Sequence, residues 1–92
     1  MNEKTYIIRA VAFANGVPCP HSGQFVQSFD HDAFNGRGYG VFTDEPDRAL
    51  RFATAADAMA FWRKQSTVQT LRLDGKPNRP LTALTAVIEQ VL

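Results

Sequence analysis

Only one long segment, residues 55–66, has the pattern of an α-helix of ordinary length. Thr54 precedes it as a helix N-cap, and Asp57 follows three residues later, where a capping box places an acidic side chain. The segment contains no glycine or proline. A rotation of about 100° per residue brings a largely apolar set to one face: Ala55, Ala58, Phe61, Trp62 and Gln65. We therefore expect one helix, at about 55–66, that packs on a sheet.

The other apolar segments have the β-branched character of strands. The first, 5–14, ends at an Asn15-Gly16 turn, and the last, 81–91, is rich in Thr, Val, Ile and Leu. Glycine- and proline-containing loops separate the shorter predicted strands, which cover 24–29, 41–43 and 50–53. We expect the two terminal strands to pair centrally. The fold class is α+β: a small antiparallel sheet of about four to five short strands with the helix on one face.

The chain is short and nearly neutral, and both properties limit what it does. Its 92 residues suit a single globular domain, 1–92. The formal net charge of +1 excludes a polycation that binds nucleic acid through bulk charge alone. The single cysteine, Cys19, cannot form an intramolecular disulfide, which is typical of a reducing compartment. Residues 10–29 lack charged side chains, but prolines and glycines interrupt them, so we expect a cytoplasmic protein without a membrane span.

Residues 37–42, with the sequence Arg-Gly-Tyr-Gly-Val-Phe, resemble the RNP1 signature of the RNA-recognition motif family. In that family aromatic side chains stack on RNA bases and a leading basic residue contacts phosphate, which implies these roles for Tyr39 and Arg37. Asp44 departs from the signature, and 14–35 has too many turn residues for the helix that the family requires. The alternative is a glycine-rich turn. Other basic residues that would extend such a surface are Arg63, Lys64, Arg72, Lys76 and Arg79.

A second cluster combines the residue types of metal sites and nucleophilic catalysis: Cys19, His21, Asp30, His31 and Asp32. Its spacing lacks the paired ligands of structural zinc sites. A calcium loop that began at Asp30 would have Asn35 and Val41 where glycine and glutamate are required. We therefore expect no metal, no cofactor and no catalytic residue, with Cys19 as an inert thiol.

The terminal strands provide the leading functional hypothesis, because both faces of 5–14 are largely apolar. Alternation places Tyr6, Ile8, Ala10 and Ala12 on one face and Ile7, Arg9, Val11 and Phe13 on the other. Apolar surface in excess of one small core is typical of a contact site. We expect a non-enzymatic binding or regulatory domain that contacts a protein partner or itself through Ile7, Val11, Phe13, Val87 and Val91. The alternative is a nucleic-acid-binding module that uses Arg37, Tyr39 and the basic residues named above.

The C-terminal half also resembles short, uncharacterised proteins of proteobacterial genomes and prophage regions. The residues that carry this resemblance lie in three stretches: 43–52, 58–66 and 74–83. The resemblance implies an accessory bacterial protein. Since those proteins have no assigned activity, it assigns no functional residue here.

Overall fold

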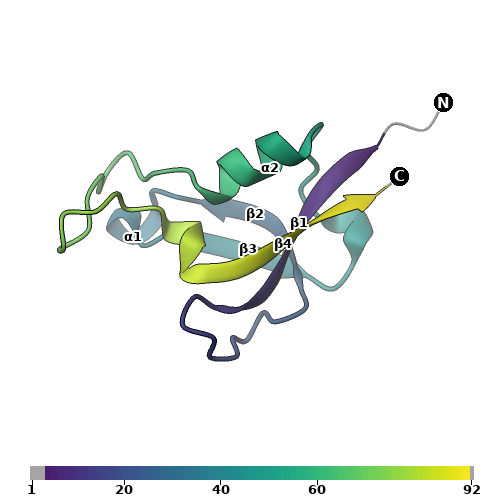
Figure 1. Ribbon diagram of the computed structural model, residues 1–92, viewed down its shortest axis with the longest axis horizontal. Helices are drawn as coiled ribbons and strands as arrows, with labels where there is room; N and C mark the ends of the chain where they lie inside the picture. Colours follow the sequence, from purple (N-terminus) through teal and green to yellow (C-terminus); the bar gives the residue numbers. More distant parts are fainter. Residues whose placement is uncertain (1–3, 92) are drawn as a thin grey trace.

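Four strands form one antiparallel sheet in the computed structural model, which describes residues 4–91 (Figure 1). Their order is β3-β2-β1-β4, and their bounds are β1 Thr5–Phe13, β2 Phe25–Asp30, β3 Tyr39–Thr43 and β4 Leu84–Val91. The helical elements are the short turn α1 (Ala33–Gly36), the main helix α2 (Ala55–Trp62), and the 3₁₀ turns η1 (Pro46–Arg48) and η2 (Pro80–Ala83). The predicted α+β fold, with one main helix on a small antiparallel sheet, is confirmed.

The terminal strands pair along their whole length, from Thr5 opposite Val91 to Phe13 opposite Leu84. This pairing was predicted, but β4 lies at the edge of the sheet rather than at its centre.

A β-bulge interrupts β1 where Ala10 pairs with Ala86 and Ala12 with Thr85. The extra residue reverses the alternation of side chains beyond it. Phe13 therefore does not share a face with Ile7, and this part of the sequence interpretation is corrected.

The strands β1 and β2 share a single residue pair, Arg9 opposite Phe25. Beyond it the chain inserts between them: Phe52 exchanges two backbone hydrogen bonds of 2.9 Å with Tyr6, and the Leu50 N–H donates to the Val26 carbonyl at 2.9 Å. The strand predicted at 50–53 is thus only a bridge at Phe52. The β2–β3 pair diverges from the β1–β4 pair as a result.

Helix α2 begins where the sequence predicts, since the Thr54 hydroxyl accepts a hydrogen bond from the Asp57 N–H at 3.0 Å. It ends at Trp62 rather than at Ser66, because Arg63 leaves the helical conformation with φ −90° and ψ 2°. The Ser66 N–H instead donates to the Asn78 carbonyl at 2.8 Å. Tertiary hydrogen bonds therefore override local helix propensity over the last predicted turn.

The main core lies between the sheet and α2. Its centre consists of four side chains with at most 1% of their surface exposed: Ile8, Val26, Ala58 and Leu81. The aromatic residues Phe52, Phe61 and Trp62 pack around it. The Trp62 indole N–H also donates to the Leu84 carbonyl at 3.1 Å, which ties the end of α2 to the start of β4.

A smaller cluster lies on the opposite face of the sheet, where Ile7 packs with Phe25, Ala49 and Val91. Ile7 is completely buried, because the segment after η1 brings Ala49 over it. The expectation that Ile7 offers apolar surface to a partner is therefore corrected. No helix among residues 4–91 is long and apolar enough to cross a membrane.

Candidate functional site

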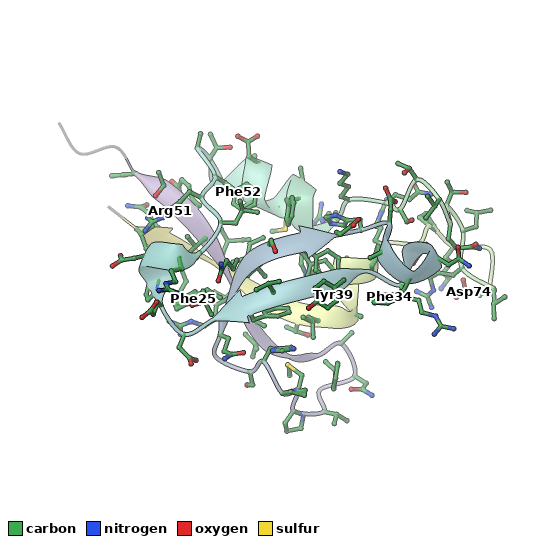
Figure 2. The ribbon with its side chains drawn as sticks, turned by 180° about the vertical axis from the view of Figure 1, so that it is seen from behind. Phe25, Phe34, Tyr39, Arg51, Phe52 and Asp74 are labelled. Carbon is green, nitrogen blue, oxygen red and sulfur yellow. The ribbon has the colours of Figure 1, made fainter. Side chains whose placement is uncertain are left out.

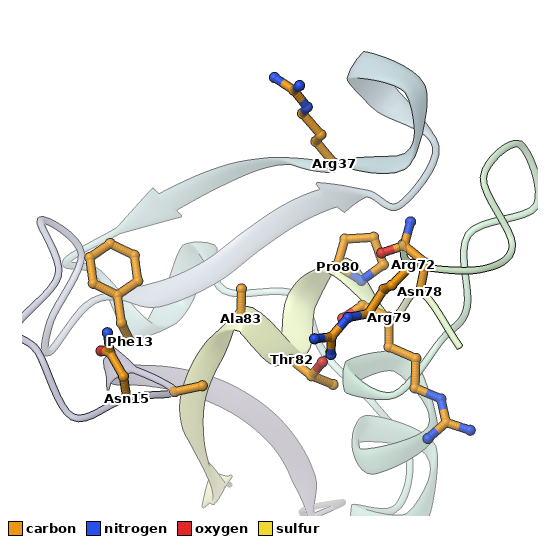
Figure 3. Close-up of a pocket in the computed structure, with 10 residues that line it drawn as sticks. Phe13, Asn15, Arg37, Arg72, Asn78, Arg79, Pro80, Thr82 and Ala83 are labelled. Carbon is orange, nitrogen blue, oxygen red and sulfur yellow. The ribbon is translucent and has the colours of Figure 1, made fainter. Parts of the chain in front are cut away.

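An open pocket of about 580 Å³ lies at the end of the molecule that carries α1 and η2 (Figure 3). We call it the arginine pocket, because its lining includes the three arginines Arg37, Arg72 and Arg79. Arg37 stands on the side of the β2–β3 pair, while Phe13, Asn15 and Thr82 lie across from it at the end of β1 and in η2 (Figure 3). The divergence of the two strand pairs creates this space.

The three arginines come from segments that are distant in the sequence. Arg37 precedes β3, Arg72 lies in the loop after α2, and Arg79 precedes η2. Arg72 forms an ion pair of 3.0 Å with Asp74. No carboxylate within residues 4–91 lies in ion-pairing distance of Arg37 or Arg79. Their exposed guanidinium groups are thus available to an anionic ligand. A guanidinium group can donate two parallel hydrogen bonds to a phosphate.

The turn that carries Arg37 has an unusual backbone. Phe34 and Asn35 both adopt left-handed conformations, with φ of 52° and 59°. Such conformations are uncommon for a bulky residue and cost on the order of 1–3 kcal/mol each. Gly36, at φ 83°, is required here, since a Cβ atom would lie 2.6 Å from the Gln69 Cβ. The surrounding structure therefore determines the shape of this turn against its local preference.

A set of polar side chains holds the turn in place, and we call Asp32, Ser66, Thr67 and Asn78 the polar clamp. The Asp32 carboxylate accepts from the Ser66 hydroxyl at 3.0 Å and from the Thr67 N–H and hydroxyl at 2.7 Å each. The Asn78 amide donates to the Gly36 carbonyl at 2.7 Å and to the Gln69 carbonyl at 2.9 Å. These bonds link the 32–38 turn to the loop that follows α2.

The hydrogen bonds from Thr67 and Ser66 lower the pKa of Asp32 from 3.8 to about 2. Asp32 is therefore ionised at neutral pH, which suits an acceptor of charge-assisted hydrogen bonds. The sequence interpretation considered Asp32 only as a metal-type ligand and missed the clamp, because the bonds that connect it across the fold span 34 to 42 residues. Asp32 and Asn78 fall in predicted loops, and a loop prediction does not indicate which distant residue a side chain bonds to.

Two aromatic rings beside Arg37 face solvent. Phe34 is 68% exposed and Tyr39 is 56% exposed, and their ring centroids are 6.0 Å apart at an interplanar angle of 63°. Figure 2 shows them next to each other at the α1 end of β3. Most of this aromatic surface is available for a contact with a flat ligand. We call Phe34 and Tyr39 the exposed aromatic pair.

The strand arrangement does not match the RNA-recognition motif geometry. A surface of that family on which Tyr39 and an aromatic residue of β1, such as Tyr6, lie on neighbouring strands is not formed, because β2 separates β3 from β1. Within the described chain, no helix lies between β1 and β2 either. The surface around Tyr39 is consequently built differently from the surface of that family.

The remaining basic candidates lie outside the lining of the arginine pocket. Arg63 and Lys64 directly follow α2, and Lys76 lies in the turn closed by the bridge between Leu71 and Pro77. Of the basic candidates, the structure thus places Arg37, Arg72 and Arg79 in the lining of one pocket and leaves the other three outside it.

The apolar candidates do not form one continuous patch. Val11, Phe13 and Val87 are 39%, 38% and 46% exposed, and Val91 is half-buried. Phe13 lines the arginine pocket, whereas Val87 lies opposite Arg9 on the other face of the sheet. The leading hypothesis from the sequence was a protein contact through one apolar face of the sheet. The β1 bulge and the burial of Ile7 divide that face.

The histidines and the cysteine have structural contacts. His31 is buried and makes T-shaped contacts with the Phe29 and Phe61 rings, with its Nε2 3.0 Å from the Phe61 carbonyl. Burial lowers the pKa of His31 below 6.5. His21 stacks on Phe42 with a centroid separation of 4.0 Å, and Cys19 is buried and free. Among residues 4–91, no group of three or more His, Cys, Asp or Glu is arranged to hold a metal ion.

Comparison with protein-family models, with curated proteins and with solved structures finds no match to this chain. The resemblance to short proteobacterial proteins therefore stays a prediction.

Proposed function

We propose that this chain is a small binding domain for single-stranded nucleic acid. The observation that carries this proposal is that Arg37, Arg72 and Arg79 all line one pocket, next to the exposed aromatic pair. Arginine contacts phosphate, and exposed aromatic rings stack on unpaired bases. We therefore prefer the nucleic-acid hypothesis to an apolar surface that contacts a protein. The candidate residues of that apolar surface are either buried or divided between the two faces of the sheet.

The arrangement fits a ligand that carries both anionic and flat apolar groups. The pocket offers guanidinium groups, and the exposed aromatic pair offers ring surface a few residues away along the same turn. A duplex conceals its base faces by stacking, so only an unpaired strand uses both features. With a net charge of +1, the binding is local to this end of the molecule.

The rigidity of the turn supports the same function. The polar clamp and the close packing at Gly36 hold Phe34, Arg37 and Tyr39 in one arrangement before a ligand arrives. A preorganised surface loses less conformational entropy on binding, which increases affinity. The strained backbone at Phe34 also belongs to the kind of conformation that proteins maintain at functional sites.

The test is fluorescence anisotropy with labelled single-stranded pyrimidine oligonucleotides of about ten nucleotides, since one small module covers roughly 4–16 nucleotides. We expect binding at low salt that weakens about 5- to 150-fold in the Tyr39→Ala and Phe34→Ala variants, from a stacking contribution of about 1–3 kcal/mol per base.

The arginine variants test the electrostatic part. Arg37→Ala and Arg79→Ala should each weaken binding and reduce the slope of log affinity against log salt by about 0.7. Arg63→Ala is the matched control, because Arg63 is an exposed arginine outside the pocket lining, and its affinity should stay close to the unmodified value. Absence of binding at low salt, or equal affinity of Tyr39→Ala, Arg79→Ala and the parent protein, contradicts the proposal.

A further inference from the structure

The outer edge of β4 presents unpaired backbone groups, which follows from the hydrogen bonds of its neighbour. In β1, Tyr6 bonds to Phe52, while the Ala10 N–H and carbonyl bond to Gln24 and Gly23 at 2.8 Å each. These β1 residues therefore direct their backbone groups away from β4. Because direction alternates along an antiparallel ladder, the residues between them bond to β4 instead.

The same alternation applies along β4. Val87 and Glu89 pair with Arg9 and Ile7 and direct their backbone groups inward, toward β1. The residues that direct their N–H and C=O groups outward are Ala86, Ile88 and Gln90. Each such group on an open strand edge is a potential partner for another strand.

Only the beginning of this edge is closed. The Trp62 indole occupies the Leu84 carbonyl, and within residues 4–91 no further hydrogen bond reaches the outer side of β4. From Ala86 to Gln90 the edge contains no proline, lysine or arginine, the residues with which proteins commonly protect such strands. Its charged residue, Glu89, forms an ion pair with Arg9 at 3.0 Å.

We propose that β4 pairs antiparallel with β4 of a second copy of this chain, about a two-fold axis at Ile88. This register places Ile88 opposite Ile88 of the second copy and Ala86 opposite Gln90 of the second copy. Every outward N–H and C=O group of the open stretch then has a partner. The two four-stranded sheets become one continuous sheet.

The side chains of the open stretch are compatible with this symmetry. Ile88 meets its own equivalent, and Glu89 lies opposite Val87 of the second copy rather than opposite another carboxylate. Each Glu89 keeps its ion pair with Arg9, and Val87, which is 46% exposed, gains a neighbour. A register centred on Val87 would instead oppose Gln90 to Leu84, whose carbonyl Trp62 already occupies. Self-complementarity identifies a second copy as the partner.

The proposal is independent of nucleic-acid binding, because Ala86, Ile88 and Gln90 lie outside the lining of the arginine pocket. Light scattering coupled to gel filtration, over a range of protein concentrations, gives the mass. We expect twice the monomer mass of 10.2 kDa at high concentration. A monomer at every concentration overturns the proposal.

Cysteine pairing tests the register in a Cys19→Ser background. Residues in directly opposed, non-hydrogen-bonded positions have Cα atoms about 4.5 Å apart, close enough for a disulfide. A mixture of the Val87→Cys and Glu89→Cys variants should form a cross-linked heterodimer under mild oxidation, more than either variant alone. Efficient cross-linking of Val87→Cys with itself, or a dimer that the mixture does not cross-link, overturns the proposed pairing.

A proline substitution tests the backbone contacts. Gln90→Pro removes an outward N–H at an exposed edge position, where proline is tolerated, and Gln90→Ala keeps that N–H. Because of the two-fold axis, Gln90→Pro removes two intermolecular hydrogen bonds from the dimer, one from each copy. It should therefore weaken dimerisation by about tenfold or more, whereas Gln90→Ala should not. Circular dichroism and urea unfolding establish that both variants fold. Equal dimerisation of two folded variants overturns the proposal.

Discussion

The β1–β4 strand pair and the 32–38 turn are held by different forces (Figure 1). The strand pair has a long ladder of backbone hydrogen bonds and the buried side chains of Ile7 and Ile8. The turn is attached to the loop that follows α2 by side-chain hydrogen bonds of Asp32 and Asn78. Within residues 4–91, this loop has one isolated β-bridge, between Leu71 and Pro77. One region is stabilised mainly by burial and the other by directional polar contacts.

This difference separates stability from site geometry. Apolar burial contributes about 25 cal/mol per Å² and dominates the free energy of folding. A hydrogen bond contributes only about 0.5–1.5 kcal/mol net, but it specifies distance and direction. We infer that the strand pair keeps the chain folded, while the polar clamp positions Arg37 and the exposed aromatic pair. Substitutions in the two regions should therefore affect different measurements.

The largest effect is expected in the core beneath the strand pair. Ile8→Ala removes a side chain that is only 1% exposed and leaves a cavity, so it should lower the free energy of unfolding by about 2–5 kcal/mol. Urea denaturation followed by tryptophan fluorescence measures this change. Val11→Ala, at an exposed position of β1, is the control and should cost much less. Equal losses in the two variants would show that burial does not dominate there.

A smaller effect is expected from the polar clamp. Asn78→Ala removes the amide that bonds to the Gly36 and Gln69 carbonyls, with an expected cost of about 1–3 kcal/mol. Hydrogen exchange should show faster exchange in the 32–38 turn and little change in β1. Gln27→Ala, at an exposed residue of β2, is the comparison variant. Uniformly faster exchange across the whole protein would contradict the division into two regions.

The smallest effect is expected on acidification. Burial holds the pKa of His31 below 6.5, so the unfolded chain binds a proton that folded His31 does not. Stability should therefore decrease as pH falls below 6.5 toward that lowered value. The lowered pKa of Asp32 produces a second decrease between 3.8 and about 2, since the unfolded carboxyl protonates first.

Urea midpoints measured from neutral pH to about pH 2 follow both decreases. The His31→Gln variant lacks the imidazole and should lose the first decrease, and Asp32→Asn should lose the second. If the first decrease is unchanged in His31→Gln, another group is responsible for it.

The strands and helix ends that are set by interactions between residues close in the sequence were predictable. Alternating apolar residues located the terminal strands, and the Thr54 cap located the start of α2. The exposure of Arg37 and Tyr39 also agrees with the glycine-rich signature around them. Phe34 was not selected as a site residue, because nothing in its own neighbourhood indicates what lies across the fold from it.

The sequence by itself determined the fold class, the location of the two terminal strands and the beginning of the main helix. These features depend on local hydrophobic period, capping and β-propensity, each of which operates over a few residues. Only the tertiary structure decided where α2 ends, which residues Ala49 covers, and that three distant arginines share one pocket. Those outcomes depend on contacts between residues far apart in the chain, whose geometry no local pattern specifies.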